Sequence, residues 1–196
     1  MNYDEAVFVI QFPLIKRFIH HYIYYKESYN LYKKLNLQSE FWSHTIDAHI
    51  LQAAILWCMI FGPDGDQNQT HWKKLSTNEQ LHKRFREILF QRTGFDKKSW
   101  GSYWQDMVYF RNNYAAHREL EYNRTVPNFE KALDVAYAYD EWVREILSDT
   151  HEEAGELIFP YLEEPPFEES AEELRKFVVS LLELLFKQTQ QYNQKV

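Results

Sequence analysis

The sequence is short of the residues that mark disulfide-bonded or loop-rich chains. Cys58 is the single cysteine, so no disulfide can form within one chain. Its place in the apolar run 53–61 predicts a buried, unreactive thiol. The five glycines all fall in or beside segments that look like connections, as punctuation between helices does. A reducing, cytoplasmic environment is the expectation that follows.

Long apolar runs are also missing. No stretch approaches the roughly 18 consecutive apolar residues of a membrane span, and the start Met-Asn-Tyr-Asp-Glu lacks the features of a signal peptide. The strand-like alternation of apolar and polar residues is absent as well, and no internal repeat is evident. These absences predict an all-α chain that does not enter a membrane.

Charge is unevenly distributed along the 196 residues. The net charge of −7 argues against nucleic-acid binding, because affinity for a polyanion comes mainly from Lys and Arg. Residues 71–124, however, hold 11 basic and 6 acidic side chains, whereas residues 125–196 hold 6 basic and 16 acidic ones. The middle third is therefore basic, either as a guide for RNA or as ordinary solvated helix faces.

Apolar periodicity predicts about five to six helices. They run over 3–35, with an interruption at Pro13, then 39–61, 77–93, from about Ser99 through the segment 110–119, from after Pro127 to about Ser148, and 170–191. Thr77 and Gln80 resemble a capping box, and Gly62-Pro63 and Gly94 end their helices. We expect a bundle over 1–152, an acidic proline-containing strap over 153–169 and an appended helix over 170–196 that packs on the bundle.

Two groups of residues have some of the features of metal sites. The loop 64–70 resembles the start of a calcium-binding loop, but Gln69 and Leu75 stand where the motif requires Gly and Glu. The histidine pairs His20-His21 and His44 with His49 lack the i, i+4 spacing of two ligands on one helix. We therefore expect no metal and no cofactor.

The segment Phe-Arg-Asn-Asn-Tyr-Ala-Ala-His-Arg-Glu, residues 110–119, carries the candidate chemistry. On an α-helical wheel Arg111 and Tyr114 fall on the apolar stripe of Met107, so Arg111 points inward or toward a partner. His117 comes six residues after Arg111, about 9 Å further along the helix axis. A buried guanidinium needs a partner or a cleft, so the alternative is an ion pair with a C-terminal glutamate, with His117 as a helix-end residue.

A family resemblance favours the functional reading. Arg111-Asn112, four residues and then His117 looks like the signature of the HEPN superfamily, an all-helical group with Arg and His near a helix terminus. Ala116-His117, with Trp57-Cys-Met-Ile-Phe61 and His71-Trp72-Lys-Lys-Leu75, is similar to its abortive-infection branch. The resemblance covers roughly residues 40–150.

The resemblance implies a metal-independent endoribonuclease that works as a homodimer with one composite groove, in a toxin, stress or phage-defence setting. It implies catalysis by His117 as general acid or base, by Arg111 as the phosphate-stabilising cation and by Asn112 as an orienting group, leaving 2′,3′-cyclic phosphate ends. RNA is the expected substrate, and an antitoxin or regulatory protein is a possible partner. Further candidates for substrate binding are Tyr114, Arg118, Lys97 and Lys98.

Two other functions are compatible with the sequence. A non-catalytic HEPN-like scaffold that binds RNA or protein would use the same helices, with Arg111 and His117 in structural roles. A small-molecule or nucleotide site in the aromatic core lacks a phosphate-binding glycine-rich loop, and aromatic stripes are more often plain core. Cleavage of RNA separates the first alternative from the nuclease.

Overall fold

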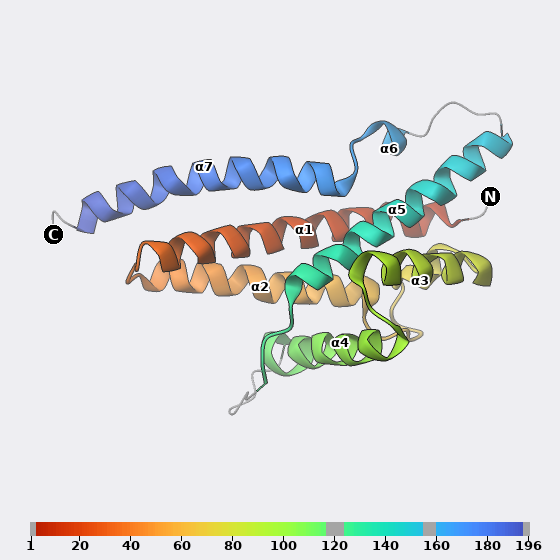
Figure 1. Cartoon of the computed structure of the whole chain (residues 1–196), viewed down its shortest axis with the longest axis horizontal. Coiled ribbons are helices and arrows are strands. Elements are labelled where there is room, and N and C mark those ends of the chain that lie inside the picture. The colour runs from red at the N-terminus through yellow and green to blue at the C-terminus, as the bar shows by residue number, and fades with distance from the viewer. Residues whose placement is uncertain (1–2, 117–123, 155–159, 194–196) are drawn as a thin grey trace.

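A computed structural model describes residues 3–116, 124–154 and 160–193 of the chain. Over these residues the chain is all-helical and contains no strand (Figure 1). Six long helices and one short one make up the fold, joined by a short 3₁₀ turn and a π-helical turn. Their bounds are α1 Glu5–Lys34, α2 Glu40–Phe61, η1 Trp72–Leu75, α3 Glu79–Thr93, α4 Lys97–Phe110, η2 Arg111–Ala116, α5 Phe129–Ala154, α6 Pro160–Glu163 and α7 Phe167–Asn193.

Side-chain caps fix the starts of the first four long helices. The carboxylate of Asp4 accepts the backbone N–H of Val7 at 3.2 Å ahead of α1, and the hydroxyl of Ser39 accepts an N–H at the start of α2. Asp96 and Ser99 form a reciprocal capping box at α4. These caps satisfy N–H groups that have no partner within the helix.

Three predicted helix ends differ from the structure. The cap of α3 is Asn78, whose side chain accepts from the N–H of Gln80 at 2.9 Å, and not Thr77. Helix α5 continues past Ser148 to Ala154, and α7 begins at Phe167, so part of the predicted strap is helical. Helix α1 passes through Pro13 without a break, because Pro13 lies on the exposed side, where water can satisfy the freed carbonyl.

Two glycines are required by the backbone. Gly94 ends α3 with φ of +71°, the left-handed conformation that favours glycine. Gly62 ends α2 so close to the preceding turn that an added Cβ would lie 2.2 Å from the carbonyl oxygen of Cys58. The chain can therefore turn sharply after α2 and form a loop across its end.

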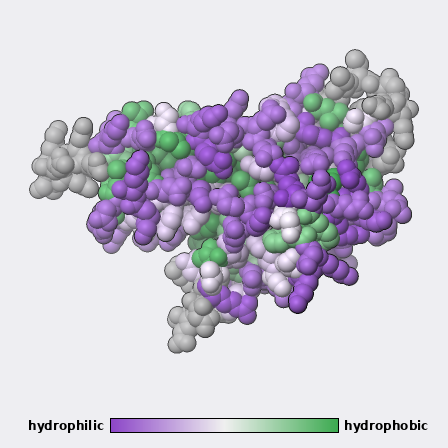
Figure 2. Space-filling model, viewed as in Figure 1, coloured by the Kyte–Doolittle hydropathy of each residue, from purple (hydrophilic) through white to green (hydrophobic). Residues whose placement is uncertain are grey.

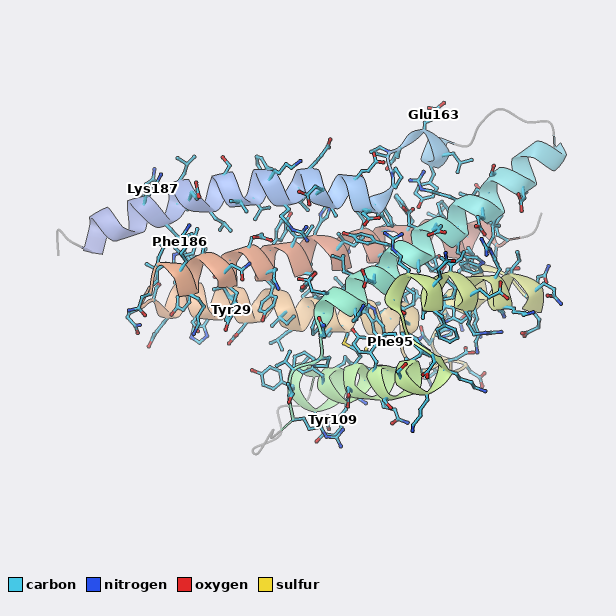
Figure 3. The ribbon with its side chains drawn as sticks, viewed as in Figure 1. Tyr29, Phe95, Tyr109, Glu163, Phe186 and Lys187 are labelled. Atoms are coloured by element: carbon cyan, nitrogen blue, oxygen red, sulfur yellow. The ribbon has the colours of Figure 1, made fainter. Side chains whose placement is uncertain are left out.

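The long helices pack in an elongated arrangement. Helices α1 and α2 form an antiparallel pair, α7 lies along α1, α5 crosses them, and α3 packs on α5 (Figure 1). One apolar core joins all of these helices, with Trp57 and Trp142 fully buried. Phe186 of α7, labelled in Figure 3, is also fully buried and stacks on Trp42 of α2 at 4.1 Å.

The face shown in Figure 2 is mainly hydrophilic, with hydrophobic residues exposed at several places, one of them over α7. The exposed hydrophobic residues of α7 include Phe177, Leu181, Leu184 and Leu185. By length and composition, α2 is the one described helix apolar enough to cross a membrane, but half of its apolar window is buried in the bundle. The core helix of a bundle can have the same length and composition, so these two features alone do not identify α2 as a membrane span.

Candidate functional site

Arg111 stands where α4 gives way to the π-helical turn, just beyond Tyr109, which is labelled in Figure 3. Its side chain is partly buried and lines an open cavity of about 690 Å³. We call this space the Arg111 cavity. Its other walls are Ile55, Cys58 and Met59 of α2, and Pro63 and residues 65–70 of the following loop.

The guanidinium of Arg111 has no ion pair in the part of the chain that the structure describes, and its Nε is buried without a hydrogen-bond partner. Two of the C-terminal glutamates are paired elsewhere: Glu168 with Arg92, and Glu172 with Arg175. The alternative of an ion pair between Arg111 and a C-terminal glutamate therefore finds no support among the described residues. A partly desolvated cation that has no ion pair among the described residues and stands at an open cavity favours binding of an anion.

The thiol of Cys58 lies beside Arg111 but is not an activated nucleophile. Burial raises the pKa of Cys58 to about 11, although the charge of the Arg111 guanidinium and its hydrogen bond to the thiol act in the opposite direction. At neutral pH Cys58 is therefore a protonated, buried thiol, as its position in the sequence predicted. Any chemistry at this cavity must come from other groups.

The loop from Gly62 to His71 forms a wall of the Arg111 cavity and is not a plain connection. Asn68 donates to the carbonyl of Pro63 at 3.0 Å, and Gln69 donates to the carbonyl of Asp66 at 2.7 Å. The hydroxyl of Thr70 donates to the carbonyl of Met59 in α2 at 2.9 Å. These side-chain bonds hold the loop against α2 and leave polar atoms along the cavity. The spacing of polar residues in this loop did not predict that the loop would line a cavity.

The π-helical turn changes the predicted geometry of the motif. An α-helical wheel places each residue 100° from the last, whereas a turn closed by i→i+5 bonds is wider. From Arg111 to Ala116 the backbone follows this wider turn, so the α-helical positions assigned to Tyr114 and His117 do not apply. Single π turns occur often at functional sites.

The other members of the motif have different surroundings. Asn112 is partly buried, and Tyr114 stacks on Phe110 with ring centroids 5.1 Å apart. His117 and Arg118 lie outside the described residues. The roles of these two residues therefore remain predictions from the sequence.

Among the described residues, the other basic side chains of the middle third do not line the Arg111 cavity. Lys97 and Lys98 occupy the first turn of α4, about 20 Å along the helix axis from Arg111. Several of the remaining cations lie in surface ion pairs: Lys73 with Asp64, Lys83 with Glu87, and Arg84 with Glu145. The structure thus separates Lys97 and Lys98 from the cavity that Arg111 lines.

The structure brings together a histidine pair that helical spacing did not reveal. His21 of α1 and His49 of α2 lie with their Nδ1 atoms 2.9 Å apart. Burial lowers the pKa of both, so both are neutral at pH 7 and one ring donates to the other. Among the described residues no cluster of three or more metal-ligating side chains occurs.

Comparisons with protein-family models, curated proteins and solved structures found no match to this chain.

Proposed function

We propose that this protein is a metal-independent endoribonuclease of the HEPN type, acting at the Arg111 cavity. The observation that carries the proposal is the guanidinium of Arg111, which has no ion pair among the described residues and stands at an open cavity whose other described polar walls are neutral apart from Asp66. A phosphodiester would supply the anion that no described residue provides. The roles of Asn112 and His117 in the proposal rest on the resemblance of Arg111, Asn112 and His117 to the family motif.

The proposed reaction is a transesterification in which the 3′ fragment leaves through its 5′ oxygen. His117, or its copy in a second subunit, removes the proton of the ribose 2′-OH, and the 2′ oxygen forms a bond to the adjacent phosphorus. The bond from phosphorus to the 5′ oxygen breaks, and this leaving oxygen takes up a proton from the protonated form of His117 or of its copy in the second subunit. Arg111 stabilises the negative charge that builds up on the phosphoryl oxygens. The products are a 2′,3′-cyclic phosphate and a 5′-OH.

Asn112 orients the histidine or the substrate in this scheme, and a homodimer provides the composite groove in which two motifs meet. DNA is not a substrate, because it lacks the attacking 2′-OH. A toxin or phage-defence role, restrained by a regulatory protein, follows from the family resemblance. Overexpression of the wild-type chain should then be toxic, and the His117→Ala variant should be harmless.

The deciding experiment incubates the purified full chain with end-labelled RNA in EDTA. Wild-type protein should give cyclic-phosphate ends, and His117→Ala and Arg111→Ala should each reduce the rate at least a hundredfold. Arg84→Ala, which removes an exposed arginine already paired with Glu145, is the matched control and should cleave normally. Equal cleavage by His117→Ala would exclude this mechanism. RNA that is bound but not cut by the wild type would identify a scaffold.

Asp66 offers a test of the cavity itself. It is the one acidic side chain among the described lining residues, it is exposed, and its charge opposes that of Arg111. Asp66→Asn should therefore tighten RNA binding, about two- to fivefold at low salt, because a repulsive charge is removed. Unchanged or weaker binding would place the RNA elsewhere on the protein.

A further inference from the structure

We propose that a second cavity, between α3, α4 and the segment after α2, binds a planar aromatic anion of the nucleotide class. Its volume is about 340 Å³, at the lower end of the range for small-molecule sites. We call it the aromatic cavity. The residues that define it are Trp72, Trp100, Gly101, Trp104, Arg86 and Asp64.

The walls of the aromatic cavity are tryptophan rings held in place from behind. The Nε1 of Trp104 donates to the carbonyl of Phe61 at 2.7 Å, so the polar edge of this ring is already satisfied. Trp72 packs against Phe85 with ring centroids 4.6 Å apart. Trp100 and Trp104 are nevertheless only partly buried, which leaves apolar ring surface open to the cavity. Such surface binds nucleobases by stacking, and each stacked base contributes about 1–3 kcal/mol.

The charges around the aromatic cavity favour an anion. Asp64 is held by Lys73, whose Nζ lies 2.9 Å away, so its negative charge is already compensated. His71 is neutral at pH 7, because burial lowers its pKa to about 4. Its Nδ1 accepts the N–H of Lys73 at 3.3 Å, as an unprotonated ring nitrogen does.

Arg86 supplies the remaining charge. It lines the aromatic cavity, and it forms no ion pair within the described part of the chain. With Lys73 and Asp64 cancelling, the lining carries one net positive charge on a guanidinium suited to a phosphate or carboxylate. Stacking surface together with one free guanidinium is the chemistry that recognises a nucleotide.

Gly101 keeps part of the aromatic cavity open. A Cβ built at this position meets no atom within 4 Å, so a larger side chain has room to grow into the space. Gly101 also lies inside α4, where replacing glycine removes a helix-destabilising residue. Gly101→Leu should therefore fill the cavity while the protein remains folded, with an unchanged or higher melting temperature.

The experiment is calorimetric titration of the full chain with AMP, adenosine and inorganic phosphate. The titrations use Arg111→Met protein, so that the Arg111 cavity provides no anion site. AMP should bind more tightly than adenosine or phosphate. Gly101→Leu should weaken AMP binding at least tenfold, and Gly65→Leu, which adds the same side chain beside the Arg111 cavity, should not. No AMP binding, or equal binding by Gly101→Leu, would overturn the proposal.

Arg86 and the source of the nucleotide are tested in the same titrations. Arg86→Gln should weaken AMP binding about tenfold and leave adenosine binding unchanged, because only the phosphate contact is lost. An equal loss for both ligands would contradict the role assigned to Arg86.

A short single-stranded RNA that binds more tightly than AMP and is sensitive to Gly101→Leu would identify a base of RNA as the occupant. Tighter binding of AMP would identify a free nucleotide. RNA cleavage by the wild-type protein is measured in a separate assay. A failure of the endoribonuclease proposal can therefore be told apart from a failure of the nucleotide-site proposal.

Discussion

The Nδ1 atoms of His21 and His49 lie 2.9 Å apart and join α1 to α2 through two imidazole rings. This bond requires one unprotonated nitrogen, and full protonation of both rings would place two cations in contact. Burial is the main cause that lowers the pKa of each, with a further contribution from Arg17 at His21 and from His21 at His49. The pair is therefore sensitive to acid.

The first prediction is that the free energy of unfolding falls as the pH drops below 6.5. Well above pH 6.5 the histidines are neutral in both the folded and the unfolded chain, so they contribute no pH dependence. Below it the unfolded chain takes up protons first, because the folded pKa values are lower, and unfolding becomes easier. The expected loss is measured by urea denaturation at pH 7.5 and 5.5.

His49→Gln should reduce this difference between pH 7.5 and 5.5, since a glutamine does not titrate. The matched control is His44→Gln on the exposed side of the same helix, which should leave the wild-type difference unchanged. An identical pH dependence in His49→Gln and the wild type would show that the pair does not govern acid sensitivity.

Arg111→Met should separate stability from activity. Methionine has a similar length and an apolar stem, and it removes a guanidinium whose Nε is buried without a partner. The free energy of unfolding should stay within about 1 kcal/mol of the wild type or rise. RNA cleavage in EDTA should be lost. A large loss of stability would instead indicate that Arg111 has a structural partner, and the cavity would lose its proposed role.

Gly94→Ala should destabilise the protein by about 1 kcal/mol, because alanine is strained at the positive φ of this helix end. Gly65→Ala is the control. Neither added Cβ would meet an atom within 4 Å, but Gly65 lacks the positive φ. The difference between the two melting temperatures thus isolates the backbone conformation. Equal effects would mean that the left-handed turn is not maintained in solution.

Asp140→Asn should loosen the junction of α5, α6 and α7. The buried carboxylate of Asp140 accepts the hydroxyl of Tyr161, the N–H of Phe167 at 2.7 Å and the Nε of Arg144 at 3.1 Å. An amide cannot balance the charge of Arg144 or accept all of these bonds. We expect a loss of about 2–4 kcal/mol and faster hydrogen exchange in the first turns of α7.

Asp149→Asn, an exposed change on the same helix, is the control for that experiment and should leave both measurements unchanged. If Asp140→Asn also left hydrogen exchange in α7 unchanged, the carboxylate would not anchor the C-terminal helix.

The helix pattern could be predicted because its signals are local. Ser39, Gly62-Pro63 and Gly94 mark helix ends by their own backbone or side-chain chemistry, and the structure places helix ends at all three. The end of α5 was missed because no glycine or proline follows Ser148 until Gly155, so only propensity was available to set the boundary.

The candidate site could be predicted only in part. The inward position of Arg111 followed from its spacing to Met107, and the structure shows a partly buried side chain. The cavity beside it depends on the loop after α2, which lies more than 40 residues away in the sequence. The π-helical turn and the contact of His21 with His49 likewise arise from packing between helices, which single-helix periodicity does not encode.

The loop from Gly62 to His71 contributes residues to both cavities. Pro63 and residues 65–70 face the Arg111 cavity, whereas Gly62, Asp64 and His71 face the aromatic cavity. A molecule that changes the conformation of this shared partition alters affinity on the opposite side, and thermodynamic linkage makes the effect reciprocal. If both proposed sites are occupied as we infer, a nucleotide on one side acts as a heterotropic signal that adjusts how strongly RNA is held on the other.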